Sequence, residues 1–282
     1  MAMKIEPSGA SCGARISGVD LSKDLSPALI AQLRAAWLEH KVVAIPDQKM
    51  DAGDLERVTM AMGGFGDDPF FDPIEGQEHI AAILREADEI SPLFAENWHS
   101  DWSFLDLPPA GTCLLSIEIP PVGGDTLFAD QVAAFAALPD KRKQYLRSLT
   151  AIHSAKLAYA PDGSYGDQDQ ANGRSMAIRP NESANETRLH PLVTTHPETG
   201  EEAIFSTLGY IIGIEGMDQP EALALLADLA QWQSQDAFVY RHKWEVGMFV
   251  MWDNRSLLHK ATGGYEGHRR ELHRTTIAAP SE

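Results

Sequence analysis

Cysteine and positive charge are both scarce in this sequence of 282 residues. It contains 2 cysteines, and its 23 lysines and arginines face 41 aspartates and glutamates, which gives a formal net charge of −18. The two cysteines, Cys12 and Cys113, lie far apart, so we expect free thiols and a reducing compartment rather than a disulfide. An excess of acidic residues argues against nucleic acid and anionic membranes as partners, because binding either requires positive charge.

Long apolar runs, repeats and flexible linkers are also missing. The N-terminal segment has no apolar stretch typical of a signal peptide, and no run approaches the roughly 18 apolar residues of a membrane span. No fixed-period repeat or low-complexity tract interrupts the chain. We therefore expect a cytoplasmic protein with no membrane or nucleic-acid partner, folded as a single domain over residues 1–282.

Many short apolar runs and a few amphipathic stretches are present instead. Leu29, Leu33 and Trp37 recur every four residues after Ser26, which predicts a helix. Helices are expected at 26–40, 51–62, 131–138, 140–149 and 219–233. Strands are expected at 41–46, 79–84, 112–119, 126–129, 192–195, 203–206, 237–244, 247–252 and 274–278. Because strands and helices do not alternate regularly, the pattern favours a mainly β fold with flanking helices over a doubly wound parallel sheet.

Two connecting segments carry specific expectations. The turn PPVGGD at 120–125 joins two strand-like runs, so these are expected to form a hairpin. The segment at about 159–188 is polar, rich in Gly, Asn, Asp and Gln, and poor in large apolar residues. A loop of this length inside a compact enzyme is usually functional, so we expect it to be an active-site lid.

The segment NWHSD contains a candidate metal-ligand pair, His99 and Asp101. On an extended segment, residues two apart point to the same side, so both side chains could bind one ion. A pair at this spacing is also common by chance, and a buried histidine beside a capping aspartate is the alternative.

The C-terminal region strengthens the metal interpretation. His259 follows an apolar strand and the turn residues Asp253 and Asn254, and Arg270 and Arg274 come 11 and 15 residues after it. Two histidines and one carboxylate on one face of the ion, with the other positions open, form the site of non-haem Fe(II) oxygenases. The arginines are candidate anchors for carboxylates.

Five segments in order resemble the taurine dioxygenase/2,4-dichlorophenoxyacetate dioxygenase (TauD/TfdA) family of Fe(II)- and 2-oxoglutarate-dependent oxygenases. They are NWHSDWSF (97–104), PPVGGDTLFAD (120–130), HPLVTTHPETG (190–200), WDNRSLLHKA (252–261) and RRELHRTTI (269–277). The resemblance extends from the early segment ISGVDL (16–21) to the last strand. It implies a double-stranded β-helix, or jelly roll, and an enzyme that consumes O2 and 2-oxoglutarate.

The resemblance assigns His99, Asp101 and His259 as the catalytic metal ligands. Iron halogenases of the wider superfamily replace the carboxylate by a small residue, so Asp101 favours hydroxylation. Hydroxylation of a carbon that bears a heteroatom would collapse to an aldehyde or keto product and a leaving group. A metal-dependent hydrolase and a non-catalytic metal- or 2-oxoglutarate-binding protein remain the alternatives.

The same resemblance assigns Thr126 and Arg270 to the distal carboxylate of 2-oxoglutarate. Arg269 is the competing candidate for that role, but residues four apart on a strand share a face, so Arg270 and Arg274 would enter the pocket together. Arg274 matches the position that contacts either the substrate anion or the iron-proximal carboxylate of 2-oxoglutarate in relatives.

The expected substrate is a small anionic organic acid, a carboxylate or a sulfonate. Taurine dioxygenases carry a histidine in the segment that corresponds to Phe70 and Phe71, and a small aliphatic residue where this chain has Trp102, so taurine itself is not expected. Phe70, Phe71, Trp102 and Tyr210 could form an aromatic wall beside Arg274, or could belong to the core. Relatives are commonly dimers or tetramers, so a homo-oligomer is expected.

Overall fold

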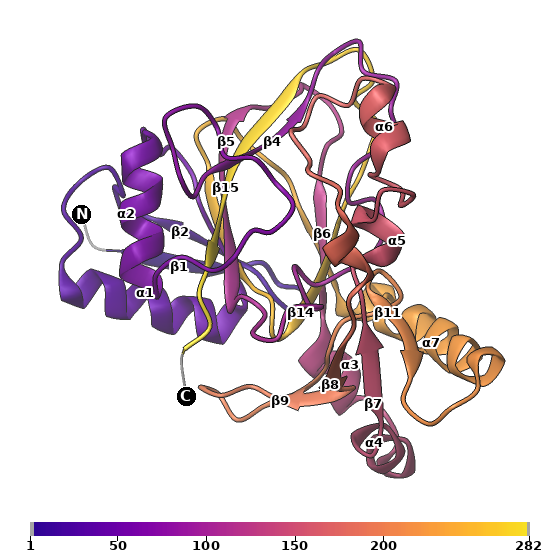
Figure 1. The fold of residues 1–282 in the computed structure, drawn as a ribbon. Helices are drawn as coiled ribbons and strands as arrows, with labels where there is room; N and C mark the ends of the chain where they lie inside the picture. Colours follow the sequence, from indigo (N-terminus) through magenta and orange to yellow (C-terminus); the bar gives the residue numbers. More distant parts are fainter. Residues whose placement is uncertain (1–2, 281–282) are drawn as a thin grey trace.

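The computed structural model describes residues 3–280 and is built around a sheet of seven strands (Figure 1). Neighbouring strands are antiparallel except for one parallel pair, β2 and β3. From edge to edge the strands are β1 (Lys4–Pro7), β2 (Ala14–Ser17), β3 (Val42–Ile45), β13 (Phe249–Asp253), β5 (Gly111–Glu118), β15 (Arg270–Ile277) and β4 (Ala81–Arg85). Segments from both ends of the chain therefore meet in this major sheet.

Smaller sheets form the second layer of the fold. One consists of β12 (Val239–His242), β6 (Thr126–Asp130) and β14 (Leu257–Ala261), and another of β11 (Ile211–Ile214), β7 (Thr150–His153) and β8 (Arg188–Pro191). A two-stranded sheet pairs β9 (Val193–Thr195) with β10 (Glu202–Ile204). Phe128 of β6 and Leu257 of β14 share a buried cluster with Trp252 of the major sheet, so the two layers pack face to face.

Helices flank the sheets, with α1 and α2 together on one side in Figure 1 and α3, α4 and α7 on the other. They are α1 (Pro27–His40), α2 (Ala52–Met62), α3 (Gln131–Ala136), α4 (Asp140–Arg147), α5 (Lys156–Tyr159), α6 (Asp167–Ala171) and α7 (Gln219–Gln233), with 3-10 turns at Glu182–Asn185 and Asp236–Phe238. The hydroxyl of Ser26 accepts from the backbone N–H of Leu29 at 3.2 Å and caps α1. The predicted mainly β fold with flanking helices is confirmed.

Strand β13 in the middle of the major sheet is apolar from residue 249 to 252 because both of its faces are covered. On β13, Met251 packs in one cluster with Trp37 of α1 and Leu55 of α2. Its neighbours Val250 and Trp252 point the other way, into the cluster shared with the second layer. Side chains alternate along a strand, so a strand buried on both faces has no polar positions. This explains the uninterrupted apolar run that predicted β13.

The expected hairpin between 112–119 and 126–129 is wrong. β5 pairs with β13 and β15 in the major sheet, whereas β6 pairs with β12 and β14 in the second layer. The intervening PPVGGD turn therefore carries the chain between layers. Gly123 has φ 68°, and a Cβ there would lie 2.5 Å from the carbonyl oxygen of Gly264, so only glycine fits this close approach.

Several strands were not predicted, including β1, β2, β7, β8, β11 and β14. Each has only 4 or 5 residues, and short runs give little periodicity. β15 was expected from residue 274 but begins at Arg270, because its polar first half pairs with β4 at the end of the major sheet.

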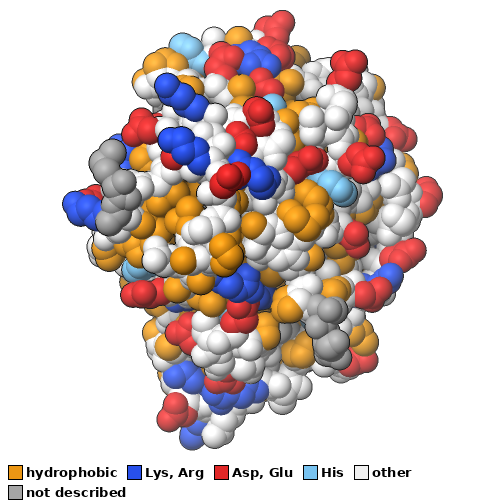
Figure 2. Space-filling model, turned by 90° about the vertical axis from the view of Figure 1, so that its left-hand side faces the viewer, with side chains coloured by type: hydrophobic (Ala, Val, Ile, Leu, Met, Phe, Trp, Pro, Cys, Tyr) orange, Lys and Arg blue, Asp and Glu red, His pale blue; other side chains and the backbone are white. Residues whose placement is uncertain are grey.

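The state of the two cysteines and the distribution of surface charge can be compared with the expectations from the composition. Cys12 and Cys113 are free and buried. The face that carries α1 and α2 shows acidic and basic side chains interspersed, without a broad basic patch (Figure 2). Among the helices of residues 3–280, none combines the length and the apolar character needed to cross a membrane.

Candidate active site

His99 and His259 lie opposite each other in a short antiparallel bridge. The backbone N–H of His99 donates to the carbonyl of His259 at 3.1 Å, and the N–H of His259 donates to the carbonyl of His99 at 2.9 Å. The centroids of the two imidazole rings are 4.2 Å apart. Because His259 belongs to β14, this bridge fixes the segment around His99 against the second layer.

Asp101 completes a cluster of three possible metal ligands. Its Oδ1 lies 3.6 Å from Nε2 of His99 and 3.6 Å from Nε2 of His259, and all three residues are buried. Nδ1 of His99 lies 2.8 Å from the carbonyl of Asn97. Since a carbonyl can only accept, Nδ1 carries the proton and Nε2 presents its lone pair. One ligand atom from each residue lies within 4.8 Å of the others, a donor set that suits Fe(II).

The environment favours the protonation state that metal binding requires. Burial, and then the neighbouring His99, lower the pKa of His259 to about 3, so this imidazole is neutral. Burial by itself would raise the pKa of Asp101, but His259, His99 and Arg274 outweigh it and hold this pKa below its ordinary value. Metal ligands must be deprotonated, and the pKa shifts of His259 and Asp101 favour that form.

Arg270 is a buried cation without a carboxylate partner among residues 3–280. It is 6% exposed, its Nη2 donates to the carbonyl of Gly124 at 3.3 Å, and its Nε has no hydrogen-bond partner. Burial lowers its pKa. Thr126, whose hydroxyl accepts from Nε1 of Trp244 at 3.0 Å, lines the same cavity as Arg270 and the three metal-ligand candidates. A buried guanidinium without a counter-ion is unfavourable, so this cavity suits a carboxylate ligand.

Arg274 lines the same cavity but has a counter-ion within the chain. Its Nη2 donates to Oδ2 of Asp68 at 2.6 Å. The guanidinium carbon lies 4.3 Å from the ring centroid of Phe71 and 5.0 Å from that of Trp102. Within residues 3–280, Nε of Arg274 and Oδ1 of Asp68 are buried without hydrogen-bond partners. The two arginines of β15 therefore differ in charge environment, since one is paired and the other is not.

The four predicted aromatic residues lie in one buried cluster. Phe70 stacks on Tyr159 with ring centroids 4.7 Å apart, and Phe71 lies 5.9 Å from Trp102. In the described part of the chain, none of the four lines the cavity that contains His99, Asp101 and His259. Tyr210 lines a second cavity, to which His99 also contributes.

This second cavity is largely apolar. It adjoins the first, since His99, Phe94 and Ala95 line both. Side chains that contribute to it include Trp98, Leu157, Ala158, Leu208 and Tyr210. His99 therefore lies where a cavity with arginines meets a cavity suited to an apolar group, whereas Asp101 and His259 line only the first.

The segment 159–188 contributes directly to the first cavity through Arg174 and Met176. Arg174 is buried and forms an ion pair with Asp169 of α6, and its Nη1 lies 3.7 Å from Oε1 of Glu89. This buried charge cluster ties the segment to the loop that follows β4.

Three residues that shape the site were not identified from the sequence: Asp68, Thr112 and Asn254. The hydroxyl of Thr112 donates to Oδ2 of Asp101 at 2.6 Å, and Nδ2 of Asn254 donates to Oγ1 of Thr112 at 2.9 Å. Asn254 lies in the WDNRSLLHKA segment, but no spacing rule connects it with Thr112. The contact depends on the pairing of β5 with β13, which the sequence does not reveal.

Comparison with known proteins gives matches over nearly the whole chain. The family model described as taurine catabolism dioxygenase TauD, TfdA family matches residues 4–276. The (S)-phenoxypropionate/alpha-ketoglutarate-dioxygenase of Delftia acidovorans is 32% identical over 276 residues, which cover 92% of this chain and 89% of the relative. The alpha-ketoglutarate-dependent sulfate ester dioxygenase of Pseudomonas putida is 30% identical over 278 residues, which cover 98% of this chain and 89% of the relative. The crystal structure of AAD-2 with Mn(II) and N-oxalylglycine superposes with a TM-score of 0.80 at 27% identity, covering 100% of this chain and 99% of that one.

Proposed function

This chain belongs to the TauD/TfdA family of 2-oxoglutarate-dependent dioxygenases, and from that premise we propose which of its residues hold the cofactors and which substrates it takes. It is an oxidoreductase with the double-stranded β-helix (jelly-roll) fold. It uses Fe(II), 2-oxoglutarate and O2 to hydroxylate a C–H bond of a small anionic organic acid.

His99, Asp101 and His259 are the iron ligands in this proposal. The convergence of their three ligand atoms, with a neutral imidazole at His259 and an ionised carboxylate at Asp101, supports the assignment. When bound, Fe(II) would activate O2, of which one oxygen atom would enter succinate as 2-oxoglutarate loses CO2 and the other would oxidise the C–H bond. The three side chains hold the metal from one face and leave the remaining positions open.

Arg270 and Thr126 bind the distal carboxylate of 2-oxoglutarate in this proposal. Arg270 is buried without a counter-ion, and the dicarboxylate would supply one. A guanidinium fork meets a carboxylate with two parallel hydrogen bonds, and a hydroxyl adds a third. Arg270 thus selects 2-oxoglutarate over a monocarboxylic keto acid.

Arg274 is the proposed anchor for the anionic group of the substrate. Asp68 already neutralises part of its charge, so a substrate with one negative charge is favoured over a dianion. The apolar second cavity beside His99 suits an aryl or alkyl body. The substrate class that fits both features is an aryloxyalkanoate, an alkyl sulfate ester or an alkyl sulfonate, and relatives act on phenoxypropionate and on sulfate esters.

Succinate formation with a small panel of acids tests this proposal. The panel contains 2-phenoxypropionate, 2,4-dichlorophenoxyacetate, hexyl sulfate, hexanesulfonate and taurine. We expect at least one of the first four to accelerate succinate formation well above the rate without substrate, and taurine not to. Acceleration by taurine alone would contradict the proposed class.

Asp68→Asn is expected to destabilise the protein in a way that a substrate anion reverses. The substitution leaves Arg274 buried without its counter-ion, which costs about 1–3 kcal/mol at a partly exposed pair. A bound anion would replace that counter-ion, so 2-phenoxypropionate should raise the melting temperature of the variant more than that of the wild type. Asp67→Asn, at the exposed neighbouring position, is the matched control and should behave like the wild type. Equal stabilisation of all three proteins would contradict an anion site at Arg274.

The segment 159–188 is the proposed lid, and Arg174 holds it closed. Replacing Arg174 by alanine leaves the buried carboxylate of Asp169 without its ion-pair partner and leaves Glu89 paired only with Arg85. We expect faster amide hydrogen exchange in this segment, with little change elsewhere. Arg188→Ala removes only partly exposed ion pairs and serves as the control. Unchanged exchange in the Arg174 variant would show that the charge cluster does not fasten the segment.

We also propose a cytoplasmic location and a homo-oligomer, a dimer or a tetramer. The two buried free thiols support a reducing compartment. Light scattering of the purified protein tests the oligomeric state, and a monomeric mass would contradict it.

A further inference from the structure

A chain of buried hydrogen bonds ends on the carboxylate of Asp101. Nε1 of Trp252 donates to Oδ1 of Asn254 at 3.0 Å. Nδ2 of Asn254 donates to Oγ1 of Thr112 at 2.9 Å, and the hydroxyl of Thr112 donates to Oδ2 of Asp101 at 2.6 Å. All four residues are buried, with exposed fractions between 0 and 4%.

The direction of every hydrogen bond in this chain is determined. An indole N–H can only donate, so Asn254 must present its carbonyl oxygen to Trp252 and its amide N–H to Thr112. With its oxygen accepting from Asn254, the hydroxyl of Thr112 directs its proton to Asp101. The carboxylate is thereby held by Oδ2, while Oδ1 faces the two histidines at 3.6 Å.

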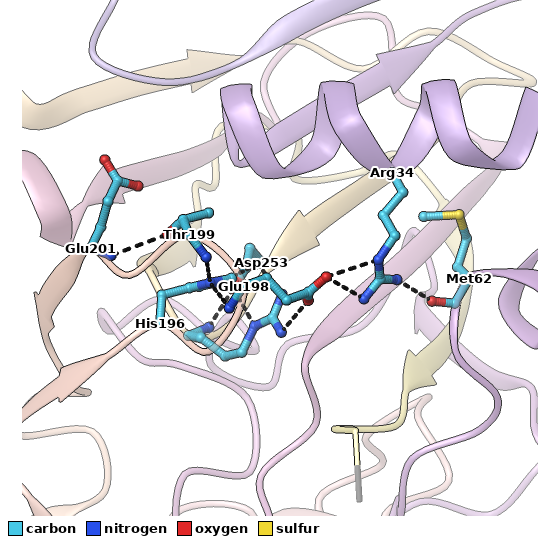
Figure 3. Close-up of polar contacts among 8 residues, drawn as sticks. Arg34, Met62, His196, Glu198, Thr199, Glu201 and Asp253 are labelled. Atoms are coloured by element: carbon cyan, nitrogen blue, oxygen red, sulfur yellow. Dashed lines mark hydrogen bonds and ion pairs between the residues drawn. The ribbon is translucent and has the colours of Figure 1, made fainter. Parts of the chain in front are cut away.

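The turn that carries Asn254 is itself fixed by a polar cluster on its other side (Figure 3). Asp253 accepts from Nε2 of His196 at 3.0 Å and from Nη2 of Arg255 at 2.6 Å. Glu198 accepts from Arg255 at 2.9 Å and from Nε of Arg34 at 2.9 Å, which connects the turn to α1. The backbone N–H of Asn254 also donates to the carbonyl of Ala110. Asn254 is therefore held independently of the metal-ligand residues.

We propose that Thr112 and Asn254 are positioning residues that orient the carboxylate of Asp101 for the metal. The inference rests on the proposed assignment of Asp101 as a ligand. Partners of ligating groups commonly change metal affinity by about 10- to 100-fold when they are removed. A hydrogen bond to Oδ2 also leaves Oδ1 as the coordinating oxygen and withdraws some of its electron density.

Thr112→Val tests the role of the hydroxyl with little change of volume. We expect the apoprotein variant to bind Mn(II) and Co(II) about 10- to 100-fold more weakly in calorimetric titrations. Thr112→Ser keeps the hydroxyl and should remain within a few-fold of the wild type. In the anaerobic Fe(II)–2-oxoglutarate complex of Thr112→Val, the visible charge-transfer band should move to longer wavelength, because the carboxylate donates more strongly.

Thr59→Val is the matched control for general destabilisation. Thr59 is equally buried on α2, and its hydroxyl bonds Thr275 and the carbonyl of Leu55 on the helix-covered side of the major sheet. The metal affinity of the Thr59→Val variant should equal that of the wild type. Asn254→Ala, which leaves Thr112 in place, should weaken binding in the same direction by a smaller factor and decides the matter if Thr112→Val does not fold.

Three results would overturn the proposal. They are wild-type affinity and band position in Thr112→Val, an equal loss of affinity in Thr59→Val, and a loss in Thr112→Ser as large as that in Thr112→Val. If the wild type binds no divalent metal at all, the proposed ligand assignment itself fails. This failure is distinguished from a failure of the positioning proposal because it is seen in the wild-type protein, without any variant.

Discussion

Asp101→Ala and His99→Ala are expected to abolish succinate formation. Turnover should fall by about three orders of magnitude or more, because the two remaining ligands do not hold the metal in a defined geometry. Asp101 is the central residue, since its Oδ1 lies 3.6 Å from Nε2 of each histidine. Removing it leaves two imidazoles without the only negative charge of the cluster. Succinate formation from 2-oxoglutarate, with and without an active acid from the panel, measures the effect.

The fold should survive these substitutions, because the bridge between residues 99 and 259 is made by backbone groups. Circular dichroism and the melting temperature of the apoprotein check this. His273→Ala is a suitable control, since His273 lies on β15, pairs with the half-buried Glu271 and does not line the cavity of the metal-ligand candidates. It should retain metal binding and turnover. Succinate formation at the wild-type rate in either ligand variant would exclude the assignment.

Arg270→Ala is expected to raise the KM for 2-oxoglutarate by about 30-fold or more, because losing one partner of a buried charge-assisted pair costs about 2–5 kcal/mol. The KM for the organic acid should change little, since Arg270 bonds Gly124 and lines the first cavity with Thr126, and it does not line the second. Initial rates with each co-substrate varied in turn separate the two constants.

The neighbouring arginine gives a sharp control for this prediction. Arg269 points to the surface and pairs with Glu86, Glu118 and Glu271. Exposed pairs of this kind contribute about 0–1 kcal/mol, so Arg269→Ala should leave both constants nearly unchanged. If Arg270→Ala changes only the constant for the organic acid, the roles of Arg270 and Arg274 are exchanged.

The sequence predicted helices and strands correctly where the apolar pattern extended over enough residues to show its periodicity. The helix at 26–40 follows from four-residue spacing and a serine cap, and α1 begins one residue after that cap. The apolar run at 247–252 predicted β13 because both of its faces are buried. β14 has five residues and was not predicted, although it carries His259.

Tertiary pairing is what the sequence could not reveal. Spacing indicated that His99 and Asp101 share a side, but only the bridge to His259 brings the third ligand atom to them. The ion pair of Asp68 with Arg274 and the hydrogen bond from Asn254 to Thr112 join strands and loops that are distant in sequence. No single-chain pattern encodes such contacts, because they depend on the order of strands in the major sheet.

An anaerobic visible spectrum tests the central assignment most directly. Purified apoprotein is mixed with Fe(II), and 2-oxoglutarate is added afterwards. We expect a weak charge-transfer band that requires both components, that is lost in Asp101→Ala, and that needs much more 2-oxoglutarate in Arg270→Ala. Bound iron without any such band on addition of 2-oxoglutarate would contradict the proposed site, and hydrolysis by the metal centre would then be the activity to test.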